Sequence, residues 1–205
     1  MRRIVILVYC LAGCAVATDK IAHDATDGNA PPIDTPIGGN CTMPKTGTLA
    51  TWVFTGQPGD QAATPVMTTA PGVVATDVTR APALTAIAAM NSINASNWPM
   101  PAQVDATAYF TFAITPPAGC VLDIASVSIN ALASGTGPTA AVIAASPDNF
   151  AHTAPVSTTA PSTPAITTVT AVTAKAELRV YGYSASSAAG TLRLQTTLSI
   201  VGTIR

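Results

Sequence analysis

Few side chains in this sequence can do chemistry, and its four cysteines are the first to consider. They are Cys10, Cys14, Cys41 and Cys120. A cysteine thiolate is both a nucleophile and a metal ligand, and two thiols can join in a disulfide where the compartment is oxidising. No CxxC pair and no His/Cys cluster occurs in the sequence, so the spacing does not indicate a structural zinc site. What the thiols do therefore depends on where the protein resides.

The N-terminus has the layout of an export signal. Arg2 and Arg3 supply positive charge, and Ile4–Ala12 form an apolar run. That run falls within the roughly 7 to 15 residues of a signal core and is too short to span a bilayer, which takes about 20. It ends in Leu-Ala-Gly-Cys at Cys14, which resembles the lipobox of bacterial lipoprotein precursors. In that family the cysteine receives a diacylglycerol, and signal peptidase II cleaves just before it.

The resemblance implies that residues 1–13 are a signal peptide, removed together with Cys10, and that Cys14 carries the lipid. Ala15 follows Cys14, in place of the aspartate that commonly retains lipoproteins at the inner membrane of enteric bacteria. An outer-membrane or cell-surface location is therefore favoured. Two alternatives stay open, namely an ordinary secretory signal cut near residues 15–17 and a buried N-terminal strand.

In an exported protein, Cys41 and Cys120 remain to form one disulfide. It would close a loop of about 80 residues and stabilise the domain by roughly 4 kcal/mol in the chain-entropy model. Two unpaired thiols are the alternative. Residues 14–45 are rich in Asp, Pro and Gly and contain no aromatic residue, which predicts a flexible tether after the lipidated cysteine. The folded domain is then expected over residues 46–205.

Acid–base and nucleophilic catalysis have little support in this sequence. Of the two histidines, His23 lies in the tether and His152 in a predicted loop, and no GxSxG, HExxH or phosphate-binding glycine motif occurs. The carboxylates show no spacing that indicates a glycosidase pair. With 9% charged residues and a net charge of -1, the chain offers no basic surface for nucleic acid. We therefore expect neither an enzyme nor a nucleic-acid partner, and a hydrolase is the less favoured alternative.

The elements that must position any site are β-strands. In Tyr109–Thr115 the apolar residues alternate, and in residues 190–202 the same alternation marks the clearest half-buried strand. Turn sequences separate these runs, which predicts an all-β fold, an antiparallel sandwich. A phase change predicts a β-bulge near Ala125 or Ser126, and a short helix is predicted at Ala83–Met90. Further strands are expected to begin at Leu49, Gly72, Cys120, Thr139, Pro164 and Lys175.

The order of several motifs is more specific than their periodicity. TWVFTGQPGDQ, NSINASNW, YFTFAITPPAGCVLDIASVSI, SGTGP, SPDNF and YGYSASSAAGTLRL, within residues 49–202, resemble an uncharacterised jelly-roll-like domain of bacterial secreted and surface proteins. The resemblance implies a jelly-roll-like β-sandwich with a carbohydrate-binding relationship and no established activity. Gln195 and Thr196 replace the usual Asp-Asn. Cys120 replaces a common Tyr, so its pairing with Cys41 is a feature of this chain.

Sugar-binding sandwiches stack an aromatic ring on a pyranose and surround it with amide and carboxylate groups. Trp98 with Asn94 and Asn97 supplies this mixture in a predicted loop. Tyr181 and Tyr183, which share one face of a predicted strand, are alternative platforms. Packing roles are the other interpretation of all three rings. A structural calcium ion is a weaker expectation, because the acids of QPGD (57–60) and SPDN (146–149) supply too few of the six to eight oxygens that calcium takes.

The sequence thus predicts an exported cell-envelope protein, held to the membrane by its N-terminal lipid, that displays a non-catalytic binding sandwich with carbohydrate as a ligand class. The alternative is a structural or interaction lipoprotein whose partners are other envelope proteins. In that case the Thr/Ala/Pro-rich segment 151–168 would serve as a contact loop or a glycan acceptor.

Overall fold

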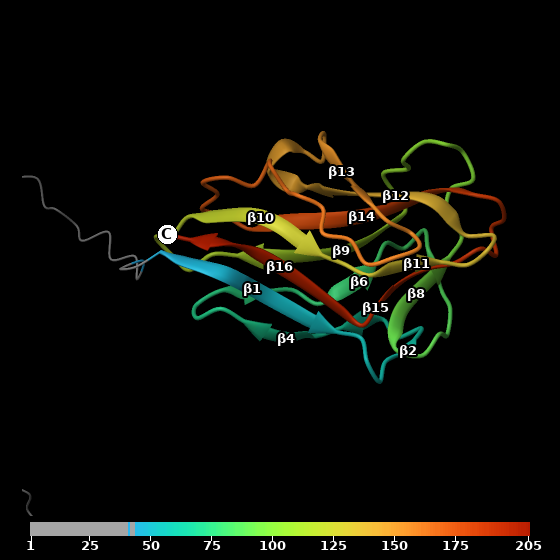
Figure 1. The fold of residues 1–205 in the computed structure, drawn as a ribbon, viewed down its shortest axis with the longest axis horizontal. Helices are drawn as coiled ribbons and strands as arrows, with labels where there is room; N and C mark the ends of the chain where they lie inside the picture. Colours follow the sequence, from blue (N-terminus) through green and yellow to red (C-terminus); the bar gives the residue numbers. More distant parts are fainter. Residues whose placement is uncertain (1–40, 42–43) are drawn as a thin grey trace, which may run out of the picture. The chain divides into compact units, whose positions relative to one another are not determined.

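Strands make up nearly all of the regular structure in the computed structural model, which describes residues 41 and 44–205 (Figure 1). A first sheet runs in the order β10–β16–β1–β4, and its pairs are antiparallel. The strand that opens the domain, β1, therefore pairs with the strand that closes the chain, β16. The bounds are β10 (Leu122–Ser128), β16 (Thr197–Ile204), β1 (Lys45–Val53) and β4 (Val66–Thr69).

A second antiparallel sheet runs in the order β13–β12–β14–β9–β6–β3, and β5 also pairs with β9. Only Pro65 separates β3 from β4, so the chain crosses there from the second sheet to the first. The bounds are β13 (Thr153–Val156), β12 (Pro138–Ala145), β14 (Ala176–Ala185), β9 (Tyr109–Thr115), β6 (Val78–Arg80), β3 (Ala63–Thr64) and β5 (Val74–Ala75).

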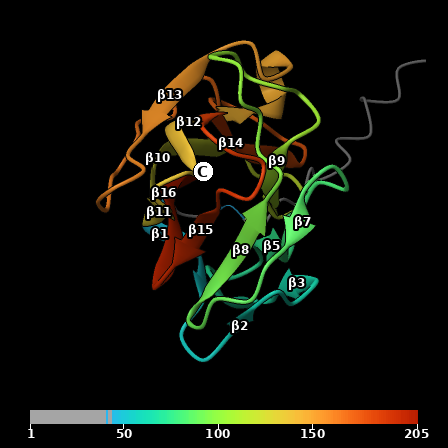
Figure 2. The ribbon, with the colours of Figure 1, turned by 90° about the vertical axis from the view of Figure 1, so that its right-hand side faces the viewer.

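A third sheet runs β11–β15–β8–β2, with β7 paired to β8. The short β2–β8 pair is parallel, whereas the other pairs between named strands of the described range are antiparallel. Figures 1 and 2 place β15, β8 and β2 at the end of the domain opposite the C-terminus. The bounds are β11 (Ala131–Ala133), β15 (Leu192–Gln195), β8 (Ser92–Ser96), β2 (Pro58–Gly59) and β7 (Thr85–Ala86).

Alternating side chains from these sheets fill one hydrophobic core. On β9, Phe110, Phe112 and Ile114 are buried, as the alternation predicts. The ring of Trp52 on β1 lies across from Phe112, with the ring centroids 5.3 Å apart. Burying each such side chain contributes about 1.5–3 kcal/mol. The predicted all-β antiparallel sandwich is confirmed, while the predicted signal peptide and nearly all of the tether lie outside the described residues.

The predicted β-bulge in the first sheet is also confirmed. The register between β10 and β16 shifts between Ile124 and Ser126, which leaves Ala125 as the extra residue with its side chain exposed. Because of this insertion, Leu122 and Ile124 before the bulge and Val127 after it all face the core.

Residues 190–202 form two strands, where the periodicity predicts one. β15 pairs with β8, whereas β16 pairs with β1 and β10. Between them Thr196 adopts φ 58°, a left-handed conformation that turns the chain from one sheet into another. Leu194 and Leu198 on either side are both buried, so the apolar alternation continues across the break. The alternation alone therefore could not reveal the crossing.

The strand predicted from Pro164 is wrong. Residues 162–172 run irregularly beside β10 and form isolated bridges to β10 and to Ile129 just after it. The N–H groups of Ile124 and Val127 donate to Val169 and Pro164 carbonyls. Prolines lack an N–H, so this segment can cover a sheet edge without offering a regular ladder to another chain.

The helix predicted at Ala83–Met90 is also wrong. This stretch contains β7 and turns, and the N–H of Ile87 donates to the carbonyl of Asn94 on the neighbouring strand. Pairing with β8 thus takes the hydrogen bonds that a helix would have used. A single 3-10 turn, η1 (Ser146–Asp148), is the helical element in the part of the chain that the structure describes. No helix there is long and apolar enough to cross a membrane.

Candidate functional site

The cysteines fix where the chain enters the domain. The predicted lipid attachment site, Cys14, lies outside the described residues. Cys41 forms a disulfide with Cys120, and their Cα atoms are 5.5 Å apart, in agreement with the predicted pair. Lys45 at the start of β1 pairs with Ile204 near the C-terminus. Entry, exit and disulfide therefore lie at one end of the domain.

Trp98 is a core residue, which corrects its prediction as a stacking platform. Its side chain is 2% exposed, and its Nε1 donates to the Ala95 carbonyl oxygen at 2.8 Å. The ring packs against Phe110 with a centroid separation of 5.3 Å. A sugar cannot stack on a ring that has no exposed face. The indole therefore stabilises the sandwich end, which is the packing role considered as the alternative.

The two asparagines near Trp98 do not join it in one site. Asn97 adopts φ 66°, and its Nδ2 donates to the Ala83 carbonyl at 2.9 Å, so it shapes the turn after β8. Asn94 is 3% exposed and faces away from the core side of β8, which Ile93 and Ala95 occupy. Asn94, Asn97 and Trp98 therefore lie in three different environments: the outer face of β8, the turn after it and the core.

Tyr181 and Tyr183 belong to an aromatic cluster on the outer face of the second sheet. They alternate with Leu178 and Val180, which point into the core, as the sequence predicts. We call this cluster the aromatic face; it comprises Tyr109, Val142, Ala144, Phe150, Arg179, Tyr181 and Tyr183.

Arg179 occupies the ring surfaces of two members of this face. Its guanidinium carbon lies 4.2 Å from the ring centroid of Tyr109 and 4.1 Å from that of Phe150. Its Nε donates to Glu177 Oε1 at 2.7 Å. Tyr181 is buried beside them, and that burial raises the pKa of its phenol. These groups satisfy one another, so Tyr109, Tyr181 and Phe150 pack the sheet surface and offer no open platform.

Tyr183 is the member of the aromatic face next to the loop between β8 and β9. It is half-buried, and the N–H of the adjacent Ser184 donates to the Pro101 carbonyl oxygen at 3.1 Å. Tyr183 thus lies beside the loop between β8 and β9, which projects from the domain in Figure 1. This loop surrounds a hollow of about 430 Å³, a size typical of ligand pockets. The lining residues are Pro99, Pro101, Gln103, Val104, Asp105 and Ala106.

We call Tyr183 together with residues 99–106 the loop site. The hollow itself is lined by an amide from Gln103 and a carboxylate from Asp105, and the partly buried ring of Tyr183 belongs to the neighbouring strand β14. Hydrogen bonds from the Thr107 hydroxyl and N–H lower the pKa of Asp105, so this carboxylate is ionised at neutral pH. Sequence reasoning identified Tyr183 but missed Gln103 and Asp105, because a loop of small and polar residues carries no periodic signal.

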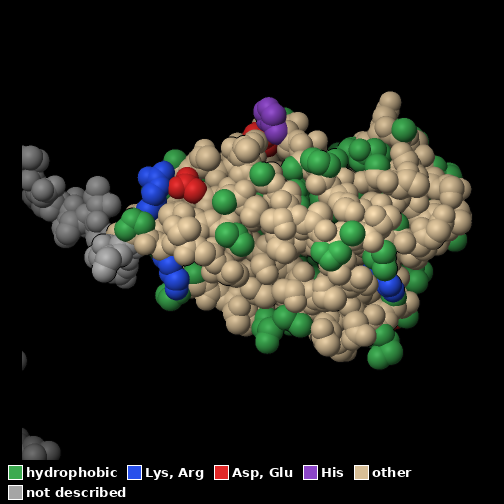
Figure 3. Space-filling model, viewed as in Figure 1, with side chains coloured by type: hydrophobic (Ala, Val, Ile, Leu, Met, Phe, Trp, Pro, Cys, Tyr) green, Lys and Arg blue, Asp and Glu red, His purple; other side chains and the backbone are tan. Residues whose placement is uncertain are grey.

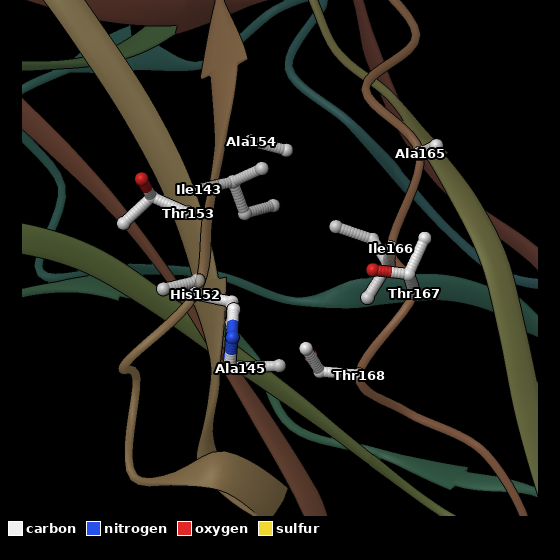
Figure 4. Close-up of a pocket in the computed structure, with 10 residues that line it drawn as sticks. Ile143, Ala145, His152, Thr153, Ala154, Ala165, Ile166, Thr167 and Thr168 are labelled. Carbon is white, nitrogen blue, oxygen red and sulfur yellow. The ribbon is translucent and has the colours of Figure 1, made fainter.

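A smaller cavity of about 70 Å³ lies between β13 and residues 165–168 (Figure 4). Ile143 and Ile166 point toward one another across it. Its volume is far below the roughly 300 Å³ at which ligand pockets begin. His152 also lines the cavity. Its Nδ1 lies 2.8 Å from Asp148 Oδ2, and its side chain is largely exposed. This pair orients the turn after η1 and faces no third catalytic group in the lining.

The two turns considered for calcium hold one acid each, Asp60 and Asp148. Asp148 Oδ2 already accepts from the His152 backbone at 3.0 Å. Among residues 41 and 44–205, no three His, Cys, Asp or Glu side chains gather into a group that could hold a metal ion. A calcium site at either turn stays a prediction without a complete donor set there.

The visible surface carries few charges (Figure 3), and the hollow with the largest volume lies at the polar loop between β8 and β9. Fold and site together define an all-β sandwich with a ligand-sized hollow at its loop end. No model of a known protein family matches the chain, and no curated protein matches it.

Proposed function

We propose that the protein is an exported, lipid-anchored cell-envelope protein that displays its sandwich as a non-catalytic binding module for carbohydrate. The Leu-Ala-Gly-Cys sequence ending at Cys14 supports the anchor. Each buried acyl methylene contributes about 0.8 kcal/mol, so two or three chains hold a protein on a bilayer for long times. The alanine after Cys14 favours the outer membrane or the cell surface.

The observation that carries the binding role is the loop site. A pyranose has an apolar side that suits the exposed part of the Tyr183 ring, and hydroxyl groups that suit Gln103 and Asp105. The hollow of about 430 Å³ is large enough for a small saccharide.

The position of the loop site also suits display. β9 begins at Tyr109, directly after the loop, and runs toward the end of the domain where Cys120 is tied to Cys41. The loop site therefore lies at the end away from the point where the chain enters. A domain tethered at its entry end presents this loop to solvent.

Two experiments test the proposal. Labelled palmitate should be incorporated into the wild-type protein and not into Cys14→Ser, and equal labelling of both would remove the anchor. The full-length protein, kept in a detergent without a sugar headgroup, should bind glycans on an array. Binding should weaken strongly in Tyr183→Ala and be unchanged in Met67→Ala, an exposed control site on β4 of the first sheet.

The second candidate is a structural or interaction lipoprotein without a small ligand. Its support is the scatter of exposed apolar side chains over the domain, which could contact other envelope proteins: Met67, Val74, Met90, Met100 and Val104. A folded protein that binds no glycan but crosslinks to envelope proteins through these positions would favour it. A hydrolase is the least supported, since four of the domain's acids, Asp105, Asp123, Asp148 and Glu177, engage in separate local contacts.

A further inference from the structure

The outer face of the third sheet carries a row of three side chains on adjacent strands. Arg193 on β15 lies directly opposite Asn94 on β8 and opposite Leu132 on β11. Residues directly opposite one another project to the same face, with Cβ atoms about 4.5–5.5 Å apart. The core sides of these strands are taken by residues such as Ile93 and Leu194. The row therefore points away from the core.

Two polar atoms of this row are buried without a hydrogen-bond partner. They are Asn94 Oδ1, an acceptor, and Arg193 Nε, a donor. Asn94 is 3% exposed, so its amide has little access to bulk water. Buried polar atoms are nearly always paired in folded proteins, and an unpaired one is unfavourable. Two such atoms on facing residues leave one acceptor and one donor free for a third group.

Space for that group lies beside Arg193. A hollow of about 150 Å³ is lined by Leu132, Ala133, Ser134, Thr191 and Arg193. A single water needs only about 10–15 Å³ of such a cavity. The hollow therefore exceeds a single water site, although it is too small for a whole oligosaccharide. We call the row and this hollow together the notch.

The two unpaired atoms define the chemistry of the missing group. It must donate to Asn94 Oδ1 and accept from Arg193 Nε. An ionised carboxylate can accept from the arginine but cannot donate to the amide oxygen, and an ammonium group can only donate. A hydroxyl group does both, and Ser134 and Thr191 surround it with further polar groups.

We propose that the notch binds a hydroxyl-bearing edge of a neutral saccharide, as a second contact separate from the loop site. The proposal rests on the proposed function for the ligand class, and its chemistry comes from Asn94 and Arg193. It names the ligand more narrowly, because uronic acids and phosphorylated sugars bring an anion toward the Asn94 oxygen.

The test is a titration of the full-length protein followed by ¹H–¹⁵N NMR, which observes the Arg193 Nε–H and the Asn94 side-chain amide directly. The probes are the methyl pyranosides of glucose, mannose and galactose. Permethylated glucoside, which has acceptors but no donors, and inorganic phosphate serve as comparison ligands. The protein is held in a detergent without a sugar headgroup.

At least one methyl pyranoside should shift both side-chain resonances, and permethylated glucoside should not. Arg193→Met keeps an unbranched apolar side chain over Leu132 and removes the donor, so it should weaken binding by about tenfold or more. Tyr183→Ala should leave these shifts in place, which separates failure of the notch from failure of the loop site.

Three results would overturn the proposal. One is the absence of shifts at Arg193 and Asn94 with all three pyranosides, even if resonances around Tyr183 move. Another is an equal response to permethylated glucoside, which would make the hydroxyl donor irrelevant. The last is a response to phosphate alone, which would make the notch an anion site.

Discussion

Two arginines on the outer faces of two sheets have opposite surroundings. The guanidinium of Arg179 lies against two aromatic rings and donates to Glu177. Arg193 is also half-buried on a strand, yet its Nε has no partner. The difference teaches that residue type and strand position do not define a role here. An arginine whose donors are satisfied within the fold stabilises the domain, and one whose buried donor is free is available to a ligand.

The largest expected loss of stability is that of Arg179→Ala, which is compared with Arg193→Ala. Arg179→Ala loses two cation–π contacts and an ion pair, which together should cost about 2 kcal/mol of unfolding free energy. Arg193→Ala should cost less than about 1 kcal/mol, because only packing of its stem is lost. Urea unfolding of both variants measures this. Equal losses would mean that the two arginines do not differ as the structure indicates.

Two asparagines allow a similar comparison between a residue without a partner and a residue that the fold uses, with expected stability changes of about 1 kcal/mol. Asn94→Val removes an unpaired buried acceptor and suits a strand, so it should raise stability by about 1 kcal/mol while abolishing saccharide binding at the notch. Asn97→Val should lower stability by at least about 1 kcal/mol, because it forces a β-branched residue to positive φ and removes the bond to Ala83. Thermal unfolding of both variants shows whether each substitution raises or lowers stability. A destabilised Asn94→Val that still binds methyl pyranosides would contradict the account of the notch.

A smaller gain is expected where the third sheet passes into the first. Thr196 is a β-branched residue at φ 58°, a conformation that asparagine adopts more easily. Thr196→Asn should therefore raise the unfolding free energy by about 0.5 kcal/mol. Thr197→Asn, one residue later and inside β16, is the matched control and should not stabilise. Stabilisation by the control alone would show that strain at Thr196 is absent.

The smallest expected effect is a pH dependence of stability that comes from Asp148, two residues before Phe150 of the aromatic face. Burial pushes the pKa of Asp148 up, but the hydrogen bonds from His152 and Ala151 outweigh it and hold that pKa below the ordinary value. Its contribution to stability is therefore present above the unfolded pKa of about 3.9 and is lost as the pH falls through the lower folded value.

Melting temperatures measured from neutral pH down to acid should fall less steeply for Asp148→Asn than for the wild type. The notch has no carboxylate in its row or its lining, so Arg193→Met should follow the wild-type curve. Parallel curves for wild type and Asp148→Asn would show that the Asp148 contacts do not stabilise the folded state.

The sequence predicted the fold wherever one face of a strand is buried and the other is not. The alternation in β9 and β14 and the phase change at Ala125 are local signals, and the structure agrees with them. The Cys41–Cys120 pair also followed from counting the cysteines that remain after the predicted signal peptide and lipid attachment site.

What the sequence could not show depends on contacts between distant segments. Trp98 resembles an exposed sugar platform until Phe110 and Gly182 are seen to enclose it. Asn94 and Arg193 are 99 positions apart, and only the pairing of β8 with β15 brings them together. The helix predicted at Ala83–Met90 is absent because pairing with β8 takes its hydrogen bonds, and the strand predicted from Pro164 is absent because that segment meets residues 122–129 through isolated bridges instead of a regular ladder.

The most direct test of the central claim is glycan-array binding by the full-length, detergent-solubilised protein beside its Tyr183→Ala and Met67→Ala variants. The account predicts saturable binding to neutral glycans that weakens strongly in Tyr183→Ala and is unchanged in Met67→Ala. A folded wild-type protein that leaves the array blank would contradict the binding role and favour a structural lipoprotein of the envelope.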